Sequence, residues 1–212
     1  MTPRGPAGDP SPEKLSRIEI VTTALEVLDE HGLPNLSMRR ISDNLEVQPS
    51  ALYWHFPNKQ SLLAAVSDRI LQPLAAETWL LATDGRTRAL ATQLRTALLS
   101  RRDGAELVSS SFALDLLAVD LLKMISEAAA SDFGLDARGS RSCGEAVVHY
   151  TIGQAFHEQQ RAHAAAVGAA GAAGAAGALH GRAIDPFTLQ APGVAFAAGL
   201  ELIIAGAAAL GN

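Results

Sequence analysis

The sequence has little cysteine and little charge. Cys143 is the only cysteine among 212 residues, which excludes an intramolecular disulfide framework and suits a reducing cytoplasm. The 17 Lys and Arg are outnumbered by 22 Asp and Glu, which gives a net charge of −5. This balance argues against a protein that coats nucleic acid without sequence preference. The longest apolar stretches contain glycine or are interrupted by charge, so no membrane span is expected. These absences favour a cytoplasmic globular protein.

Leucine and alanine dominate an apolar content of 48%. Few runs are β-branched, so the chain is expected to be all-α. We predict a disordered tail over residues 1–13, a first domain over 14–72 and a second over 73–212. Within the second domain, glycine recurs every third residue among alanines, and residues 164–181 are expected to form a flexible loop.

A helix-turn-helix is predicted in the first domain. Ser37 can cap one short helix, and Pro49 suits the first position of the next. In such a motif the second helix enters the major groove while the first crosses the DNA backbone. The second helix carries Tyr53, Trp54 and His55 in a polar stretch, which core packing alone explains poorly. A surface that enters a DNA groove explains it better.

The candidate DNA contacts combine groove-facing side chains with phosphate anchors. Arg39 and Arg40 can reach a guanine or the backbone, and Lys59 starts the following helix as a second phosphate anchor. Against this, residues 1–72 hold seven Lys and Arg but nine Asp and Glu. The candidate DNA-contacting residues are Ser37, Arg39, Arg40, Pro49, Ser50, Ala51, Tyr53, Trp54, His55 and Lys59.

The segment from Ser16 to Ile70 resembles the amino-terminal DNA-binding domain of the tetracycline-repressor family. The string Leu-Tyr-Trp-His-Phe-x-Asn-Lys over Leu52–Lys59 matches that family's recognition helix and the helix start after it. The resemblance implies a helix-turn-helix that reads operator DNA as a dimer. One departure is Glu46, which stands where the family usually has glycine in the turn. If the position needs a positive φ, glutamate costs about 1 kcal/mol there.

The carboxyl half resembles the drug-binding branch of the same family. Arg95–Gly104 is similar to its fifth helix and the turn after it, His149–Gly153 to its eighth helix, and Phe196–Ile204 to its last. The resemblance implies a homodimer through a four-helix bundle. The final apolar segment is independently consistent with this, because a helix without a solvent face needs a partner on more than one side.

The drug-contacting positions of that branch differ in this chain. The resemblance implies that Leu90 and Leu94 stand where that branch has an asparagine and a phenylalanine. Val108 stands where that branch has its metal-binding histidine, and Ala75 stands where it has another histidine. His149 keeps its identity, whereas either His157 or Glu158 takes the place of a glutamate from the other subunit. Phe112 is a candidate for pocket wall or core. The candidate pocket residues are Ala75, Leu90, Leu94, Val108, Phe112, His149 and His157.

These substitutions predict an apolar effector other than tetracycline, since magnesium prefers oxygen ligands. His149 and His157 lie eight residues apart, roughly 12 Å along a helix, and cannot share an ion within one chain. No catalytic motif stands out, so we expect neither an enzyme nor a cofactor. The leading hypothesis is a dimeric transcriptional repressor that binds operator DNA and a small-molecule effector. The alternatives are a ligand-independent regulator and a protein-interaction module whose carboxyl half only dimerises.

Overall fold

The computed structural model describes residues 15–76, 78–166, 168 and 191–211, and within these residues it contains helices and no strands. The all-α prediction is therefore confirmed. The helices, with η for a 3₁₀ helix, are α1 (Arg17–His31), η2 (Leu33–Asn35), α2 (Met38–Asn44), α3 (Pro49–His55), α4 (Lys59–Leu71), η3 (Gln72–Ala76), η4 (Thr78–Leu81), α5 (Arg86–Leu99), α6 (Gly104–Ala113), α7 (Leu121–Phe133), α8 (Ala137–Ala166) and α10 (Pro192–Gly211).

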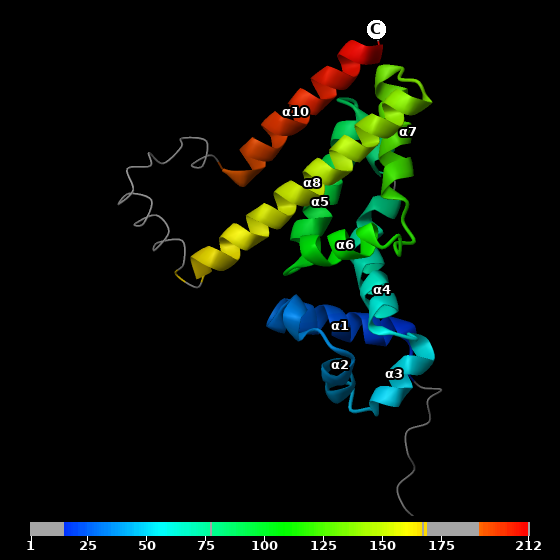
Figure 1. Cartoon of the computed structure of the whole chain (residues 1–212), viewed down its shortest axis with the longest axis vertical. Coiled ribbons are helices and arrows are strands. Elements are labelled where there is room, and N and C mark those ends of the chain that lie inside the picture. Colours follow the sequence, from blue (N-terminus) through cyan, green and yellow to red (C-terminus); the bar gives the residue numbers. More distant parts are fainter. Residues whose placement is uncertain (1–14, 77, 167, 169–190, 212) are drawn as a thin grey trace, which may run out of the picture.

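The amino-terminal helices form a compact unit at one end of the molecule, with α2 and α3 at its far tip (Figure 1). Ser16 and Glu19 make a capping box at the start of α1, and Gly32 ends that helix. Asn58 caps α4 by accepting from the Ser61 amide. Large apolar side chains fill the centre of the unit, each contributing about 1.5–3 kcal/mol by burial. The fully buried ones include Ile20, Leu28, Ile41, Leu52 and Phe56.

Helix α4 leads from this unit into the carboxyl-terminal helices (Figure 1). The expected boundary between residues 72 and 73 falls within η3, directly after α4. The long helix α8 runs diagonally across α5 and α7, and α10 lies alongside it. Their contact is built by Tyr150, whose ring stacks on Phe196 with centroids 5.6 Å apart and whose hydroxyl donates to two carbonyls of α10.

Two separate helices occupy the stretch between residues 104 and 133, because α6 ends at Ala113 and α7 begins at Leu121. Asp115 has a φ of 54° and closes α6 in a left-handed cap, with the Leu116 amide donating to the Ser111 carbonyl. Asp120 then caps α7 by accepting from the Lys123 amide.

Two sequence predictions concern segments that the structure does not describe. The tail expected over residues 1–13 lies outside the described residues, as does most of the loop expected over 164–181. Ala164–Ala166 form the last turn of α8.

Helix α10 leaves most of its apolar surface uncovered in the single chain. Its buried residues are Phe196, Leu200 and Ala207, whereas Leu202 and Leu210 are exposed. By length and apolar composition it is the one helix of the described residues that could span a membrane. A helix apolar nearly all round is also what a bundle between two subunits requires.

Candidate DNA-binding surface and effector region

Helix α3 projects two large aromatic side chains from the tip of the molecule. Trp54 is 82% exposed and Tyr53 is 50% exposed. Their neighbours Leu52 and Phe56 are fully buried and anchor the helix in the core. Exposed tryptophan is unusual on a surface with no partner. This face of α3 is therefore suited to contact another macromolecule.

The basic residues predicted to contact DNA lie on α2 and at the start of α4, the helices before and after α3. Arg39 and Lys59 are exposed, and Arg40 is half-buried. In the described part of the chain, none of these three cations takes part in an ion pair, so their charges are available to a ligand. Ser37 is used locally, since its hydroxyl accepts from the Arg40 amide at 3.2 Å and caps α2.

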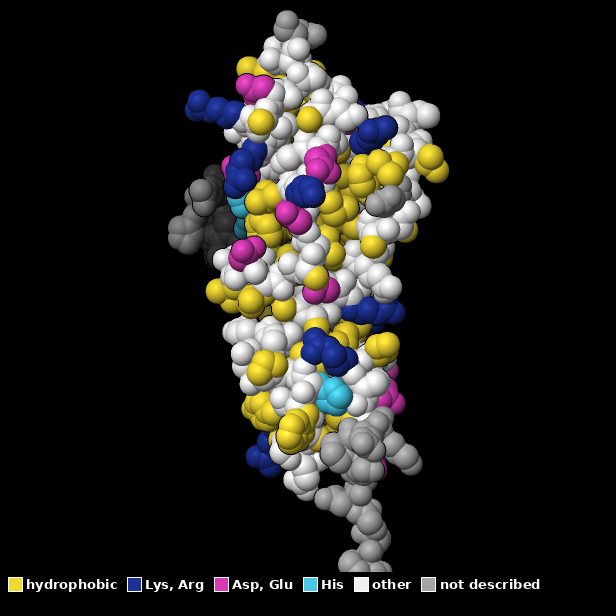
Figure 2. Space-filling model, turned by 90° about the vertical axis from the view of Figure 1, so that its right-hand side faces the viewer, with side chains coloured by type: hydrophobic (Ala, Val, Ile, Leu, Met, Phe, Trp, Pro, Cys, Tyr) yellow, Lys and Arg dark blue, Asp and Glu magenta, His cyan; other side chains and the backbone are white. Residues whose placement is uncertain are grey.

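The remaining predicted contacts lie on or beside α3. Pro49 and Ser50 are exposed in its first turn, whereas Ala51 and His55 are half-buried. The face in Figure 2 shows hydrophobic side chains, basic side chains and a histidine together at this lower end of the molecule, with acidic side chains only at the margin. Arg39 and Lys59 are therefore exposed cations on the helices before and after α3, in a segment whose overall composition is acidic.

The turn between α2 and α3 depends on an unusual backbone conformation. Glu46 has a φ of 55°, the left-handed region that favours glycine. The Val47 amide donates to the Ser42 carbonyl and the Glu46 amide to the Asp43 carbonyl, which is the Schellman pattern of a helix end. The position therefore has the positive φ at which the sequence analysis predicted a cost for glutamate.

The candidate pocket residues differ in their exposure. Leu90, Leu94 and Val108 are fully buried in the core of the carboxyl-terminal helices. Ala75 and His157 are exposed. The structure brings together the remaining two, Phe112 and His149, whose rings meet edge to face with centroids 5.9 Å apart. Phe112 also lines a cleft of about 570 Å³ between the α6–α7 loop, α7 and the start of α8.

The structure distinguishes the roles of His157 and Glu158. Glu158 accepts from the Arg95 guanidinium at 2.6 Å, and both side chains are largely buried between α8 and α5. His157 is exposed.

A buried hydroxyl pair links α4 to α6. The Ser67 and Ser111 hydroxyl oxygens lie 2.9 Å apart, and Ser67 also lies 2.9 Å from the Leu63 carbonyl oxygen. Sequence reasoning missed this contact. Both serines sit on the apolar faces of their helices, and that placement is the one signal that could have identified them.

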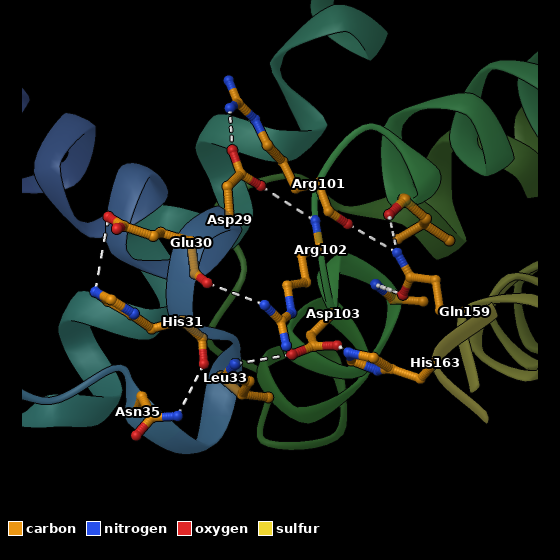
Figure 3. Close-up of polar contacts among 12 residues, drawn as sticks. Asp29, Glu30, His31, Leu33, Asn35, Arg101, Arg102, Asp103, Gln159 and His163 are labelled. Atoms are coloured by element: carbon orange, nitrogen blue, oxygen red, sulfur yellow. Dashed lines mark hydrogen bonds and ion pairs between the residues drawn. The ribbon is translucent and has the colours of Figure 1, made fainter. Parts of the chain in front are cut away.

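A polar junction joins the amino-terminal helices to the core through the turn between α5 and α6 (Figure 3). Arg101 pairs with Asp29 at 2.5 Å, and Arg102 donates from its amide to Asp29 and from its side chain to the Glu30 carbonyl. The Asp103 carboxylate accepts the Leu33 amide at 2.8 Å.

The same turn is held from the other side by α8. The Gln159 amide group donates to the carbonyls of Leu98 and Arg101 and accepts from the Ala105 amide. His163 places its Nδ1 atom 3.5 Å from Asp103. The turn therefore contacts α1, η2 and α8 at once. Among the described residues, no group of three or more His, Cys, Asp or Glu side chains is arranged to hold a metal ion.

Comparison with known proteins gives a consistent result over almost the whole chain. Residues 20–66 match the family described as bacterial regulatory proteins, tetR family, and residues 73–210 match the tetracyclin repressor-like, C-terminal domain. The tetracycline repressor protein class A from transposon 1721 of Escherichia coli is 31% identical over 206 residues, which cover 92% of this chain and 91% of that protein.

Solved structures share both the fold and the sequence. BioQ from Mycobacterium smegmatis superposes with a TM-score of 0.74 at 35% identity, covering 92% of this chain and 99% of that chain. BioQ with its natural double-stranded DNA operator gives 0.66 at 32% identity, covering 92% and 99%. A TetR variant from Acinetobacter baumannii AYE in complex with minocycline gives 0.67 at 27% identity, covering 93% and 99%.

These relatives are regulators and not enzymes, and proteins of this kind bind operator DNA and dimerise. The two family matches together span most of the chain, and the relative from Escherichia coli extends over nearly its full length. The chain is a soluble DNA-binding transcriptional regulator that belongs to the tetR family of bacterial regulatory proteins.

Proposed function

We propose that this regulator is a cytoplasmic repressor that binds an inverted-repeat operator as a homodimer and is released by a small, largely apolar effector other than tetracycline. The observation that carries the DNA-binding part is the exposure of Tyr53 and Trp54 on α3 while Leu52 and Phe56 anchor the same helix in the core. Arg39 and Lys59, both without an ion-pair partner among the described residues, supply charge for phosphates.

The apolar effector is supported by the character of the carboxyl-terminal helices. Leu90, Leu94 and Val108 present no polar atom from their side chains. Phe112 and His149 offer an aromatic edge and a ring nitrogen next to the cleft at the α6–α7 loop. Apolar walls with a few placed polar groups are typical of small-molecule sites.

A route for release runs through α4. An effector beside α6 acts close to the Ser67–Ser111 hydroxyl pair, and Ser67 lies on the helix that leads to the DNA-binding helices. Binding can shift the separation of the two recognition helices only if the effector prefers the conformation that does not fit DNA. Removing the pair with Ser67→Ala is expected to weaken this coupling more than it weakens operator binding.

The homodimer is supported by the uncovered apolar face of α10 and by the exposed side of α8. A Cβ added at Gly206 would meet no atom of the same chain, so this surface is open for another helix. Gly206→Ala adds a methyl group there and is expected to raise the dimer dissociation constant, measured by sedimentation. A dimer as tight as the wild type would exclude Gly206 from the interface.

The test starts by selecting bound duplexes from a random library with the full-length protein. We expect an inverted repeat with half-sites about 34–36 Å apart, or a small multiple of that spacing, and loss of binding in Trp54→Ala without loss of the dimer. A folded dimer that protects no inverted repeat would refute the proposal. Release of the selected duplex by tetracycline with magnesium would refute only the proposal of an apolar effector and would leave the proposed operator binding intact.

The second candidate is a ligand-independent regulator whose carboxyl half only dimerises. It is favoured by the full burial of Leu90, Leu94 and Val108, none of which lines the cleft beside Phe112. A small-molecule library screened by thermal shift separates the two candidates. Compounds that raise the melting temperature and release the duplex support the effector, whereas stabilisation by none of them favours the alternative.

A further inference from the structure

The start of α1 contacts the end of the recognition helix α3. The Arg17 Nη1 atom donates to the main-chain carbonyl oxygen of His55, across 38 residues of sequence. The Cζ atom of the same guanidinium lies 4.1 Å from the centroid of the Phe56 ring. Arg17 therefore holds α3 at two points, one polar and one aromatic.

Helix α3 is a helix that needs such support. It has seven residues, and its N-cap residue Gln48 makes no side-chain hydrogen bond to the first turn. Helices this short are unstable by themselves, and their last carbonyls lack partners within the helix. A cation at the carboxyl end satisfies one carbonyl and interacts favourably with the helix dipole.

No other side chain among the described residues makes a hydrogen bond to α3. Apart from Arg17, the helix is fixed by the buried side chain of Leu52 and by Phe56 directly after it. The exposed Tyr53 and Trp54 lie in the chain between the buried Leu52 and His55, whose carbonyl accepts from Arg17. The direction in which those two aromatic rings point is therefore set partly by Arg17.

We propose that Arg17 is a positioning residue for DNA recognition, which orients α3 through the His55 carbonyl and the Phe56 ring and does not act as a phosphate contact. This inference rests on the proposed operator binding. It separates Arg17 from Lys59 and Arg39, which have the same charge but no intramolecular partner among the described residues. The distinction is measurable, because a phosphate contact contributes to the salt dependence of binding whereas an orienting contact does not.

The experiment compares Arg17→Ala with Lys59→Ala and with Arg69→Ala, an exposed cation on α4. The probe is the fluorescently labelled duplex that the wild-type protein selects, titrated at several salt concentrations. We expect Arg17→Ala to weaken binding about tenfold with an unchanged slope of log K against log salt. Lys59→Ala should make the slope shallower by about two for the dimer, and Arg69→Ala should change neither quantity.

Arg17→Lys provides a second comparison, because an ammonium can donate to the carbonyl but lacks a planar face to lie on the Phe56 ring. Its affinity should fall between those of the wild type and Arg17→Ala. Amide hydrogen exchange of α3 in the free protein should be faster in Arg17→Ala, with the melting temperature showing that the dimer remains folded.

Two results would overturn the inference. One is an Arg17→Ala slope that becomes shallower as in Lys59→Ala, which would make Arg17 a phosphate contact. The other is unchanged exchange of the α3 amides, which would show that Arg17 does not hold the helix. The exchange measurement needs no DNA, so it decides the role of Arg17 even if the wild-type protein selects no duplex and operator binding fails separately.

Discussion

Asp103 is the residue at which replacement should most directly weaken the junction between the amino-terminal helices and the core. Its side chain is 5% exposed, and its carboxylate accepts the Leu33 amide at 2.8 Å. Its backbone φ is 53°, in the left-handed region. In Asp103→Ala, the Leu33 amide loses its acceptor in a partly buried place, which costs about 1–3 kcal/mol. Alanine in the left-handed region adds about 1 kcal/mol.

A matched control separates these two costs. Asp115 has a φ of 54° but is exposed, and its carboxylate makes no hydrogen bond to any described residue. Asp115→Ala should therefore lose only the backbone part, about 1 kcal/mol. Asp103→Asn keeps an amide oxygen for Leu33 and a residue that tolerates positive φ, so it should cost less than Asp103→Ala.

The measurement is urea unfolding followed by circular dichroism at one fixed protein concentration, because the stability of a dimer depends on concentration. In a thermal melt of the same samples, each kcal/mol of lost unfolding free energy should lower the melting temperature by about 2–4 °C for a chain of this size. Exchange of the Leu33 amide should accelerate in Asp103→Ala. A loss of stability no greater than that of Asp115→Ala would refute the reasoning that the hydrogen bond to Leu33 stabilises the junction.

Three further predictions concern single positions. Glu46→Gly should raise the unfolding free energy by about 1 kcal/mol, because it relieves a φ of 55°; unchanged urea stability would contradict this. Gly199→Ala should lower the melting temperature, since its Cβ would overlap the Tyr150 hydroxyl and push α8 from α10; a wild-type melting curve would show that the helices can adjust. The hydrogen bond from Arg88 lowers the pKa of Glu201. Its contribution is therefore present above the ordinary pKa of about 4.3 and is lost as pH falls through the lower folded value. In Arg88→Ala, a carbon-13 titration should show the pKa of Glu201 returning upward, and an unmoved pKa would remove Arg88 as the cause.

The local signals of the helix-turn-helix were readable from the sequence because each acts within a few residues. Ser37 caps α2 through a hydrogen bond from the Arg40 amide, and Pro49 takes the first position of α3. The chemistry of Tyr53 and Trp54 already indicated a surface role. Local signals did not specify the end of α6, where Asp115 takes a left-handed conformation that its residue type permits but does not require.

By itself the sequence determined the all-α class and the short helices of the helix-turn-helix, because caps and periodicity are properties of short segments. The unusual turn at Glu46 was indicated by the resemblance to the family. Only the tertiary structure decided which long side chains meet. Arg17 and His55 are 38 residues apart, and Asp103 and Leu33 are 70 apart. Such pairs depend on how whole helices pack, and nothing in either segment alone specifies the other. For that reason the exposed aromatic face of α3 could be predicted from sequence, whereas the contact of Arg17 with the end of α3 could not.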